Sequence, residues 1–161
     1  KALPALLRAY QTQVRAARVG FDWPDSPQGL AAVLDKVEEE LRELRHAILA
    51  ASTPAQTASD PKVEPTAAMA AELGDLLFSL VNVARHLKVN PEESLRLATN
   101  RFTTRFQFIE QEAARSGRAV QDLTLAELDA YWNAAKQLET QGQAETKPTL
   151  TSSTTPTDTA S

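Results

Sequence analysis

The sequence predicts an all-α fold, because three observations agree along its 161 residues. Apolar residues recur every three or four positions in several long segments, which is the period of a helix with one buried face. Helix-start signals precede these segments, and no segment alternates with the period of two that a half-buried strand requires. Only five glycines and nine aromatic residues (two Trp, two Tyr and five Phe) are present, which weakens the case for an all-β domain.

The composition indicates a soluble globular protein and excludes several functional classes. Hydrophobic residues make up 42% of the chain, and the net charge of −4 disfavours electrostatic binding to nucleic acid or to anionic membranes. Cysteine is absent, so disulfides, thiolate metal sites and cysteine nucleophiles are excluded. No uninterrupted apolar run approaches the ~18 residues of a membrane span, and no signal peptide is visible. Because the chain begins with Lys1 rather than Met, we expect it to be part of a longer protein.

The first helices are predicted from caps and apolar seams. A short leading helix is expected over residues 2–18. The next runs from about Pro27 to Ala51, since Ser26-Pro27 combines an N-cap with a proline at the first helical position. Its apolar residues follow one another at spacings of four and three, and they are Leu30, Leu34, Val37, Leu41, Leu44 and Ile48. This spacing predicts one buried face along the whole helix.

Three more helix starts follow along the chain. One helix begins near Thr66, and its seam consists of Met69, Leu73, Leu76, Leu80, Val83 and Leu87. Another opens at Asn90 with a proline and two acids, which suit the positive end of the helix dipole, and is expected to stop at Gly117. The last starts at a capping box formed by Thr124 and Glu127 and continues through Leu138. The elements together predict a helical bundle.

Two segments do not fit this helical pattern. Residues 52–64 (STPAQTASDPKVE) have the composition of a loop. Residues 140–161 contain 11 threonines or serines among 22 residues and no aromatic residue. Such a segment cannot bury enough apolar surface to offset its ordering entropy, so we expect a disordered tail. A folded domain is therefore expected over residues 1–139.

Carboxylates lie beside two of the apolar seams. Glu40 and Glu43 each precede a seam leucine, and Glu72 and Asp75 repeat this arrangement on the next long helix. An ordinary solvated face would place cations between such acids, whereas Glu39, Glu40 and Glu43 set like charges together at a small cost. If the two helices form an antiparallel hairpin, the carboxylates converge and repel unless a cation neutralises them. Oxygen-only ligands favour Mg²⁺ or Mn²⁺ over zinc or copper.

A di-iron centre is the competing metal interpretation. Glu43 and His46 form a Glu-x-x-His pair, which such bundles carry twice. The second histidine, His86, has Val83 rather than an acid three residues before it, so the motif is not repeated. We therefore expect both histidines to be ordinary, partly exposed side chains.

These acids and their flanks resemble the MazG nucleoside triphosphate pyrophosphohydrolases. Glu39-Glu40-x-x-Glu43 followed by Glu72-x-x-Asp75 resembles the EExxE…ExxD signature of that family. The flanking stretches RVGFDWP (18–24), ELGDLLF (72–78), VNVARHL (81–87) and NRFTTRF (100–106) resemble the C-terminal MazG domain of bacterial two-domain members. So does Trp132 with Lys136 on the last helix, and the likeness covers roughly residues 1–139.

The resemblance implies a helical bundle of the all-α NTP pyrophosphohydrolase type, completed by homodimerisation. It also implies Mg²⁺-dependent hydrolysis of an NTP or dNTP to the monophosphate and pyrophosphate. Together with the net charge and the absence of a long apolar run, we expect a cytoplasmic protein with neither nucleic acid nor membrane as partner. Carried over by position, the metal ligands are Glu40, Glu43, Glu72 and Asp75, and the catalytic acid beside them is Glu39. The residues that match nucleotide-binding positions are Lys36, Arg101, Arg105, Trp132 and Lys136.

Other interpretations remain open at this point. A narrower member of the same superfamily, such as a dUTPase or a phosphoribosyl-ATP pyrophosphohydrolase, carries a similar acidic signature, although the GFDWP segment favours MazG. A non-catalytic helical dimerisation module would carry the same acids as a solvated face. Trp132 stacks on a base in the first interpretation and packs in the core in the last.

Overall fold

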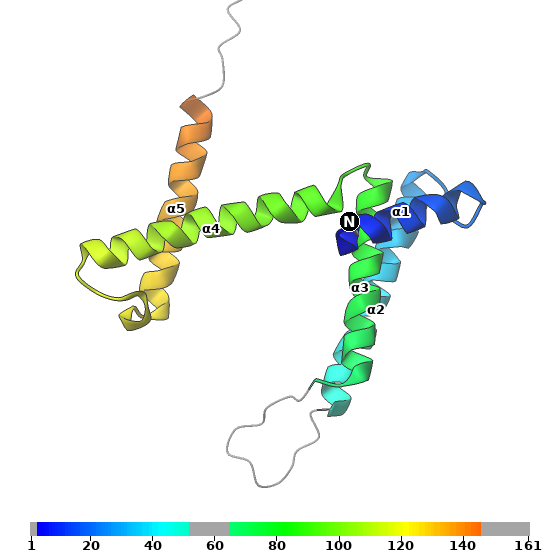
Figure 1. Cartoon of the computed structure of the whole chain (residues 1–161), viewed down its shortest axis with the longest axis horizontal. Coiled ribbons are helices and arrows are strands. Elements are labelled where there is room, and N and C mark those ends of the chain that lie inside the picture. The colour runs from blue at the N-terminus through cyan, green and yellow to red at the C-terminus, as the bar shows by residue number, and fades with distance from the viewer. Residues whose placement is uncertain (1–2, 52–64, 146–161) are drawn as a thin grey trace, which may run out of the picture. The chain divides into compact units, whose positions relative to one another are not determined.

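The computed structural model describes residues 3–51 and 65–145 and confirms the all-α fold class. Its helices are α1 (Ala5–Arg18), α2 (Pro27–Ala51), α3 (Ala67–His86), α4 (Pro91–Arg115), the 3₁₀ turn η1 (Val120–Asp122) and α5 (Leu125–Glu145), as Figure 1 shows. Within the described ranges there is no strand. Two compact units, Lys1–Leu97 and Ala98–Ser161, are joined within α4.

Each predicted N-cap makes the hydrogen bond that the sequence pattern requires. The Ser26 hydroxyl accepts from the Gly29 amide at 3.1 Å, and the Asn90 side chain accepts from the Glu93 amide at 3.1 Å. Thr66 likewise accepts from the Met69 amide at the start of α3. These bonds satisfy amides that have no partner inside the helix, which is why the starts could be located from the sequence.

The end of α4 is set by Gly117, as the sequence predicts. Gly117 has φ +70°, a conformation that a residue without a Cβ adopts at no steric cost. The Arg118 amide then donates to the Ala113 carbonyl at 3.0 Å, and the Gly117 amide donates to the Ala114 carbonyl. This pair of bonds terminates the helix and turns the chain towards η1.

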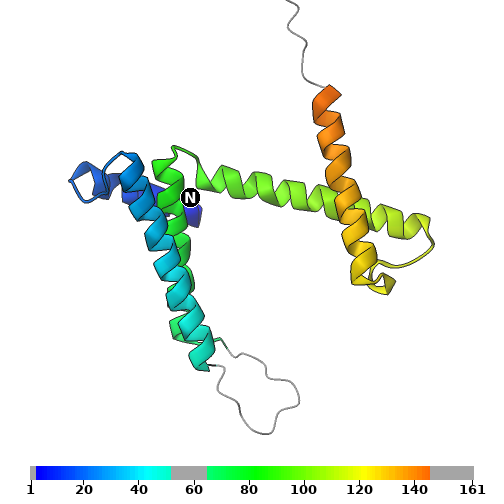
Figure 2. The same cartoon turned by 180° about the vertical axis from the view of Figure 1, so that it is seen from behind.

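In the N-terminal unit, α2 and α3 run antiparallel to each other, and α1 packs against α3. Figures 1 and 2 show the α2–α3 pair side by side from opposite directions, with α1 near the end where α2 begins. Gly29, in the first turn of α2, is buried, and a Cβ there would overlap the carbonyl group of Pro24. The chain before α2 therefore lies directly against the helix. This antiparallel pair is the arrangement that brings the two acidic segments together.

The expectation of fully buried seams on α2 and α3 is wrong for half of each seam. Every second seam residue is 38–54% exposed, and these residues are Leu34, Leu41, Ile48, Leu73, Leu80 and Leu87. The others face the neighbouring helix and are partly buried, namely Leu30, Val37, Leu44, Met69, Leu76 and Val83. A helix in a two-helix contact can cover only one side of a broad apolar stripe, so the second row stays open within the described chain.

Helix α3 thus carries apolar residues both on its covered side and on its open side. It is the one helix in the described ranges that is long and apolar enough to cross a membrane by composition. However, Glu72 and Asp75 lie within it, and charged residues are costly inside a bilayer. The absence of a membrane partner stays a prediction, and a helix with two apolar sides also suits packing between two protein neighbours.

In the C-terminal unit, α5 crosses the second half of α4, and a small core lies between them (Figure 1). Ile109, Ala113 and Leu123 are buried at its centre. The partly buried residues packed against them are Val120, Leu128, Tyr131 and Trp132. The capping box at the start of α5 is present, since the Thr124 amide donates to Glu127 at 2.8 Å and the Glu127 amide donates to the Thr124 hydroxyl at 3.3 Å.

The expected start of the tail at Thr140 differs from the structure, because α5 continues to Glu145. Extending an existing helix adds one hydrogen bond for each residue that is ordered, whereas starting a new helix is costly. Residues 140–145 therefore continue α5 despite their polar composition. The rest of the predicted tail, 146–161, and the predicted loop, 52–64, lie outside the described residues. The assignment of residues 1–139 as one domain stays a prediction.

Candidate functional site

Three of the four predicted metal ligands converge between α2 and α3. Glu40, Glu43 and Glu72 each offer a carboxylate oxygen, and these oxygens all lie within 4.8 Å of one another. Glu40 is only 6% exposed, Glu72 is half-buried and Glu43 is exposed. Three carboxylates so close together repel unless a proton or a cation reduces their charge. Their oxygens are the donors that hard divalent cations prefer.

Asp75, the fourth predicted ligand, lies one turn beyond Glu72 but outside this trio. It is exposed and lines the cavity that adjoins Glu40. Gly74, between the two acids, has no atom within 4 Å of the position that a Cβ would occupy. No described neighbouring helix therefore packs against Gly74, and the space beside the acids is open.

The ammonium of Lys36 joins Glu39 to the acidic cluster. Lys36 Nζ lies 2.6 Å from Glu40 Oε1 and 3.1 Å from Glu39 Oε1, from one turn earlier on α2. Its hydrogen bonds to Glu40 and then Glu39 raise the pKa of Lys36 above its ordinary value, so the ammonium stays charged. Lys36 thus compensates part of the negative charge at the predicted metal site. Glu39, the predicted catalytic acid, is held by the same contact and lies outside the carboxylate trio.

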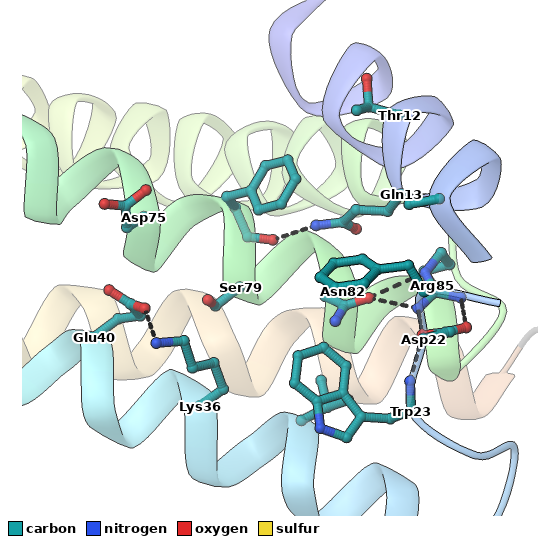
Figure 3. A pocket seen from close by; sticks show the side chains of 14 residues that line it. Thr12, Gln13, Asp22, Trp23, Lys36, Glu40, Asp75, Ser79, Asn82 and Arg85 are labelled. Atoms are coloured by element: carbon teal, nitrogen blue, oxygen red, sulfur yellow. Dashed lines mark hydrogen bonds and ion pairs between the residues drawn. The ribbon is translucent and has the colours of Figure 1, made fainter. Parts of the chain in front are cut away.

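A cavity of about 240 Å³ extends from the acids along the inside of the α1–α2–α3 unit. Figure 3 shows Glu40, Lys36 and Asp75 at one end and Gln13, Asn82 and Trp23 at the other. Apolar side chains line much of the wall between them, and these are Phe21, Trp23, Val33 and Phe78. A pocket with mostly apolar walls and a few convergent polar groups is the usual form of a small-molecule site.

Three buried polar residues line this cavity and were not predicted as site residues from the sequence. Gln13, Ser79 and Asn82 are each at most 8% exposed. A signal for them exists, since each polar residue occupies a position on the buried side of its helix: Gln13 lies three residues after Tyr10, and Ser79 three after Leu76. A polar residue at such a position marks either a structural hydrogen bond or a ligand contact.

An ion-pair network joins the segment before α2 to the end of α3. Arg85 donates to both carboxylate oxygens of Asp22, with 2.8 Å between Nη1 and Oδ2, and to the Asn82 side chain. The Arg85 guanidinium holds the pKa of Asp22 below its ordinary value. His86 Nε2 lies 3.3 Å from Asp22, and the His86 side chain is only 6% exposed. This network covers most of the His86 side chain, while the residue as a whole keeps an intermediate exposure and His46 is exposed.

The predicted nucleotide-binding residues of the last two helices lie in the C-terminal unit. Arg105 contacts the face of Trp132, with 5.3 Å between the guanidinium carbon and the ring centroid. It also pairs with Glu139 at 2.7 Å, which raises the pKa of Arg105 and lowers that of Glu139. Trp132 packs on the core of the unit, as the structural alternative for this residue predicts. Arg101 and Lys136 are exposed.

The fold and the site define a class: an all-α protein in which carboxylates from an antiparallel helix pair meet beside a ligand-sized cavity. Within this class, residues 28–107 match the MazG nucleotide pyrophosphohydrolase domain, so that region belongs to the MazG family. The matched range includes both acidic segments, with Glu40, Glu43, Glu72 and Asp75.

Curated proteins of known name resemble the chain over most of its length. It is 41% identical over 134 residues to the nucleoside triphosphate pyrophosphohydrolase/pyrophosphatase MazG of Thermotoga maritima, a match covering 83% of this chain and 45% of that protein. It is 36% identical over 139 residues to the nucleoside triphosphate pyrophosphohydrolase of Escherichia coli, covering 86% and 47%. A shorter match, 46% over 69 residues, relates 43% of the chain to 14% of the uncharacterized protein YabN of Bacillus subtilis. The chain thus spans slightly under half the length of the first two relatives.

Proposed function

We propose that this chain hydrolyses nucleoside triphosphates, ribo or deoxy, to nucleoside monophosphates and pyrophosphate. The observation that carries the proposal is the convergence of Glu40, Glu43 and Glu72 beside a cavity of about 240 Å³. The names of the relatives from Thermotoga maritima and Escherichia coli support the same reaction. The reaction consumes one water and breaks the anhydride bond between the α- and β-phosphates. A cytoplasmic location belongs to the same proposal.

The donor set fits a divalent cation. Glu40, Glu43 and Glu72 would hold Mg²⁺ or Mn²⁺, with Asp75 as a further carboxylate one turn away on α3. A bound divalent cation supplies positive charge to phosphate oxygens and lowers the pKa of a water molecule. Without it, an acidic cluster would repel a triphosphate of about four negative charges.

The chain's own residues have distinct roles in this proposal. Glu39 orients the attacking water or accepts its proton, since it lies on α2 beside the cluster and shares Lys36 with Glu40. Lys36 offers its ammonium to a phosphate oxygen, because its raised pKa keeps it charged. The cationic residues Arg101, Arg105 and Lys136 neutralise outer phosphate oxygens, and Trp132 contacts the nucleotide. Arg105 reaches a phosphate only by exchanging its bond to Glu139.

A homodimer is the second part of the proposal. The exposed seam rows on α2 and α3 are apolar, regularly spaced and on helices already paired along their other side. Regular heptad-like spacing suits burial against further helices, and a second copy supplies identical ones. The exposed row therefore supports a helical bundle completed by two chains.

Turnover by a matched pair of variants tests the site. Glu43→Gln removes one carboxylate of the trio at an exposed position, so the helix should remain intact. We expect at least about a hundredfold loss of pyrophosphate release with Mg²⁺, comparable to losing one charge-stabilising group in other active sites. We also expect Mg²⁺ to raise the melting temperature of the native protein but not that of the variant.

Glu38→Gln is the control, because Glu38 lies on the same helix, is exposed and is outside the carboxylate trio. It should retain turnover and the Mg²⁺-dependent rise in melting temperature. A non-catalytic dimerisation module would behave differently: Glu43→Gln would leave metal binding unchanged, or would stabilise the protein by relieving repulsion between carboxylates.

A further inference from the structure

The carboxylate of Asp22 ties the segment between α1 and α2 to the end of α3. Its Oδ1 accepts from the Trp23 amide at 2.9 Å and also from Arg85, while its Oδ2 accepts from Arg85 Nη1 at 2.8 Å. The Asp22 and Arg85 side chains are 21% and 13% exposed. A bidentate pair between a guanidinium and a carboxylate fixes the orientation of both groups. Asp22 therefore connects the backbone of Trp23 directly to α3.

The Arg85 guanidinium is held in place from its own helix. Its Nε and Nη2 donate to the side-chain oxygen of Asn82, one turn earlier on α3, at 3.0 and 2.7 Å. His86 Nε2 lies 3.0 Å from the same Nη2. These contacts orient the planar fork of the guanidinium, so less conformational freedom is lost when it pairs with a carboxylate. Arg85 is thus a rigid support for Asp22.

Trp23 lies between this ion pair and a second anchor at the start of α2. The next residue, Pro24, packs so closely on α2 that a Cβ on Gly29 would overlap its carbonyl group. The Pro24 carbonyl also accepts from the Ser26 amide at 2.9 Å. The chain is therefore fixed directly after Trp23 by α2 and directly before it by α3. Between the two anchors, the Trp23 side chain forms part of the cavity wall, as Figure 3 shows.

A second ion pair joins the same two parts of the chain but is solvated. Lys88 Nζ lies 3.9 Å from Asp25 Oδ2, and the two side chains are 81% and 85% exposed. Exposed pairs of this kind contribute little to stability because water and salt screen them. Of these two pairs, the one between Asp22 and Arg85 is therefore suited to fix the segment, and Asp25 provides a matched control.

We propose that Asp22 and Arg85 are positioning residues, which hold Trp23 in the cavity wall at a fixed place relative to the acids on α2 and α3. This inference rests on the proposed hydrolysis of nucleotides. Asp22 and Arg85 lie outside the carboxylate trio, so the pair affects how the nucleotide is held rather than the chemical step. Removing an interaction that is equally strong in the ground state and the transition state raises KM and leaves kcat unchanged.

Steady-state kinetics of single variants give the first test. Arg85→Met removes the guanidinium, and we expect KM for the triphosphate to rise at least about tenfold while kcat stays within about threefold of the native value. Asp22→Asn keeps an acceptor for the Trp23 amide but loses the charge. It should raise KM in the same direction, and it replaces Arg85→Met if that variant does not fold. Asp25→Asn should leave KM and kcat unchanged.

A double variant shows whether the effect passes through Trp23, since Asp22 and Arg85 also line the cavity. Trp23→Ala should raise KM, and adding Arg85→Met to it should raise KM by less than about twofold more, because residues that act as one unit are not additive. If Arg85→Met raises KM by the same factor in both backgrounds, Arg85 contacts the substrate itself and the positioning role is wrong. An unchanged KM in Arg85→Met or Asp22→Asn also overturns the proposal.

Fluorescence quenching reports on Trp23 without any substrate. The chain has two tryptophans, so Trp132→Phe leaves Trp23 as its single reporter. In this background, acrylamide should quench Trp23 at least about twofold more strongly with Arg85→Met than without it, because the released segment opens locally. Asp25→Asn should not change the quenching. Equal quenching in all three proteins overturns the proposal. If the quenching differs as expected but no triphosphate is hydrolysed, the proposed function fails and the hold of the ion pair on Trp23 stands.

Discussion

Glu127 illustrates how a partly exposed carboxylate gains a defined role from its neighbours. It pairs with Arg118, with 2.6 Å between Nη1 and Oε1, and it accepts from the Thr124 amide. These contacts, the Arg118 bond first, lower the pKa of Glu127 to about 2. The charged form is therefore favoured by folding, and Glu127 stabilises the native state wherever it is ionised in both states.

The pH dependence of this contribution follows from the direction of the shift. Because the folded pKa lies below the ordinary value of 4.5, the stabilisation is present above about pH 4.5 and is lost as the pH falls to about 2. Glu127→Gln retains the capping geometry but not the charge. We expect the native protein to melt at a higher temperature than this variant at pH 6 and at the same temperature near pH 2. A difference that does not change across this range would contradict the assignment.

Contacts between residues that are close in the sequence could be predicted, whereas contacts between distant residues could not. The caps at Ser26, Thr66 and Asn90 could be predicted because each involves atoms only three residues apart. Gln13 and its partner Phe78 are 65 positions apart, and no local pattern reports such a contact. The same holds for Asp22 and Arg85, which are 63 apart. The sequence marks these residues only as polar side chains next to apolar ones.

At the scale of elements, the acidic segments were predictable and the buried faces only partly so. Spacings of three and four residues place Glu40 with Glu43, and Glu72 with Asp75, on common faces, and an antiparallel pair brings the two faces together. The apolar seams have the same spacing of three and four residues. This spacing shows that the residues share a face, but it does not show which helix or which chain packs against that face. The exposed row containing Leu41 and Leu80 is therefore the part that sequence periodicity could not assign.

Two glycines within helices predict opposite effects of the same substitution. Alanine at Gly29 would place a methyl group against the Pro24 carbonyl, so we expect Gly29→Ala to destabilise the protein by more than about 1 kcal/mol. Gly74 has open space around it, and there alanine should add up to about 1 kcal/mol of stability through helix propensity. Thermal or denaturant unfolding measures both. A destabilising Gly74→Ala would show that another chain or segment occupies that space.

At the scale of the whole molecule, the exposed apolar rows support the proposed homodimer, in which a second copy completes the helical bundle. Two rows are too regular for scattered surface residues: Leu34, Leu41 and Ile48 on α2, and Leu73 and Leu80 on α3 with Leu87 at its C-cap. Burying them against identical rows would remove apolar surface from water at no cost in charge. The solvated acidic and basic residues would remain on the opposite faces.

The dimer has its own test. Leu41→Glu places a charge in the exposed row, so we expect the protein to change from dimer to monomer in light scattering after size-exclusion chromatography. Leu49→Glu is the control, because Leu49 is also exposed on α2 but shares its face with Arg42 and Arg45. It should remain a dimer. A native protein that is monomeric at all concentrations would contradict the assignment of this row.

The identity of the products tests the proposed hydrolysis without relying on any variant. The native protein is incubated with a panel of NTPs and dNTPs, with and without Mg²⁺, and the products are resolved by ³¹P NMR and chromatography. We expect equal amounts of nucleoside monophosphate and pyrophosphate, formed only with the metal and lost in Glu43→Gln. Nucleoside diphosphate with inorganic phosphate, or no product from any member of the panel, would contradict it.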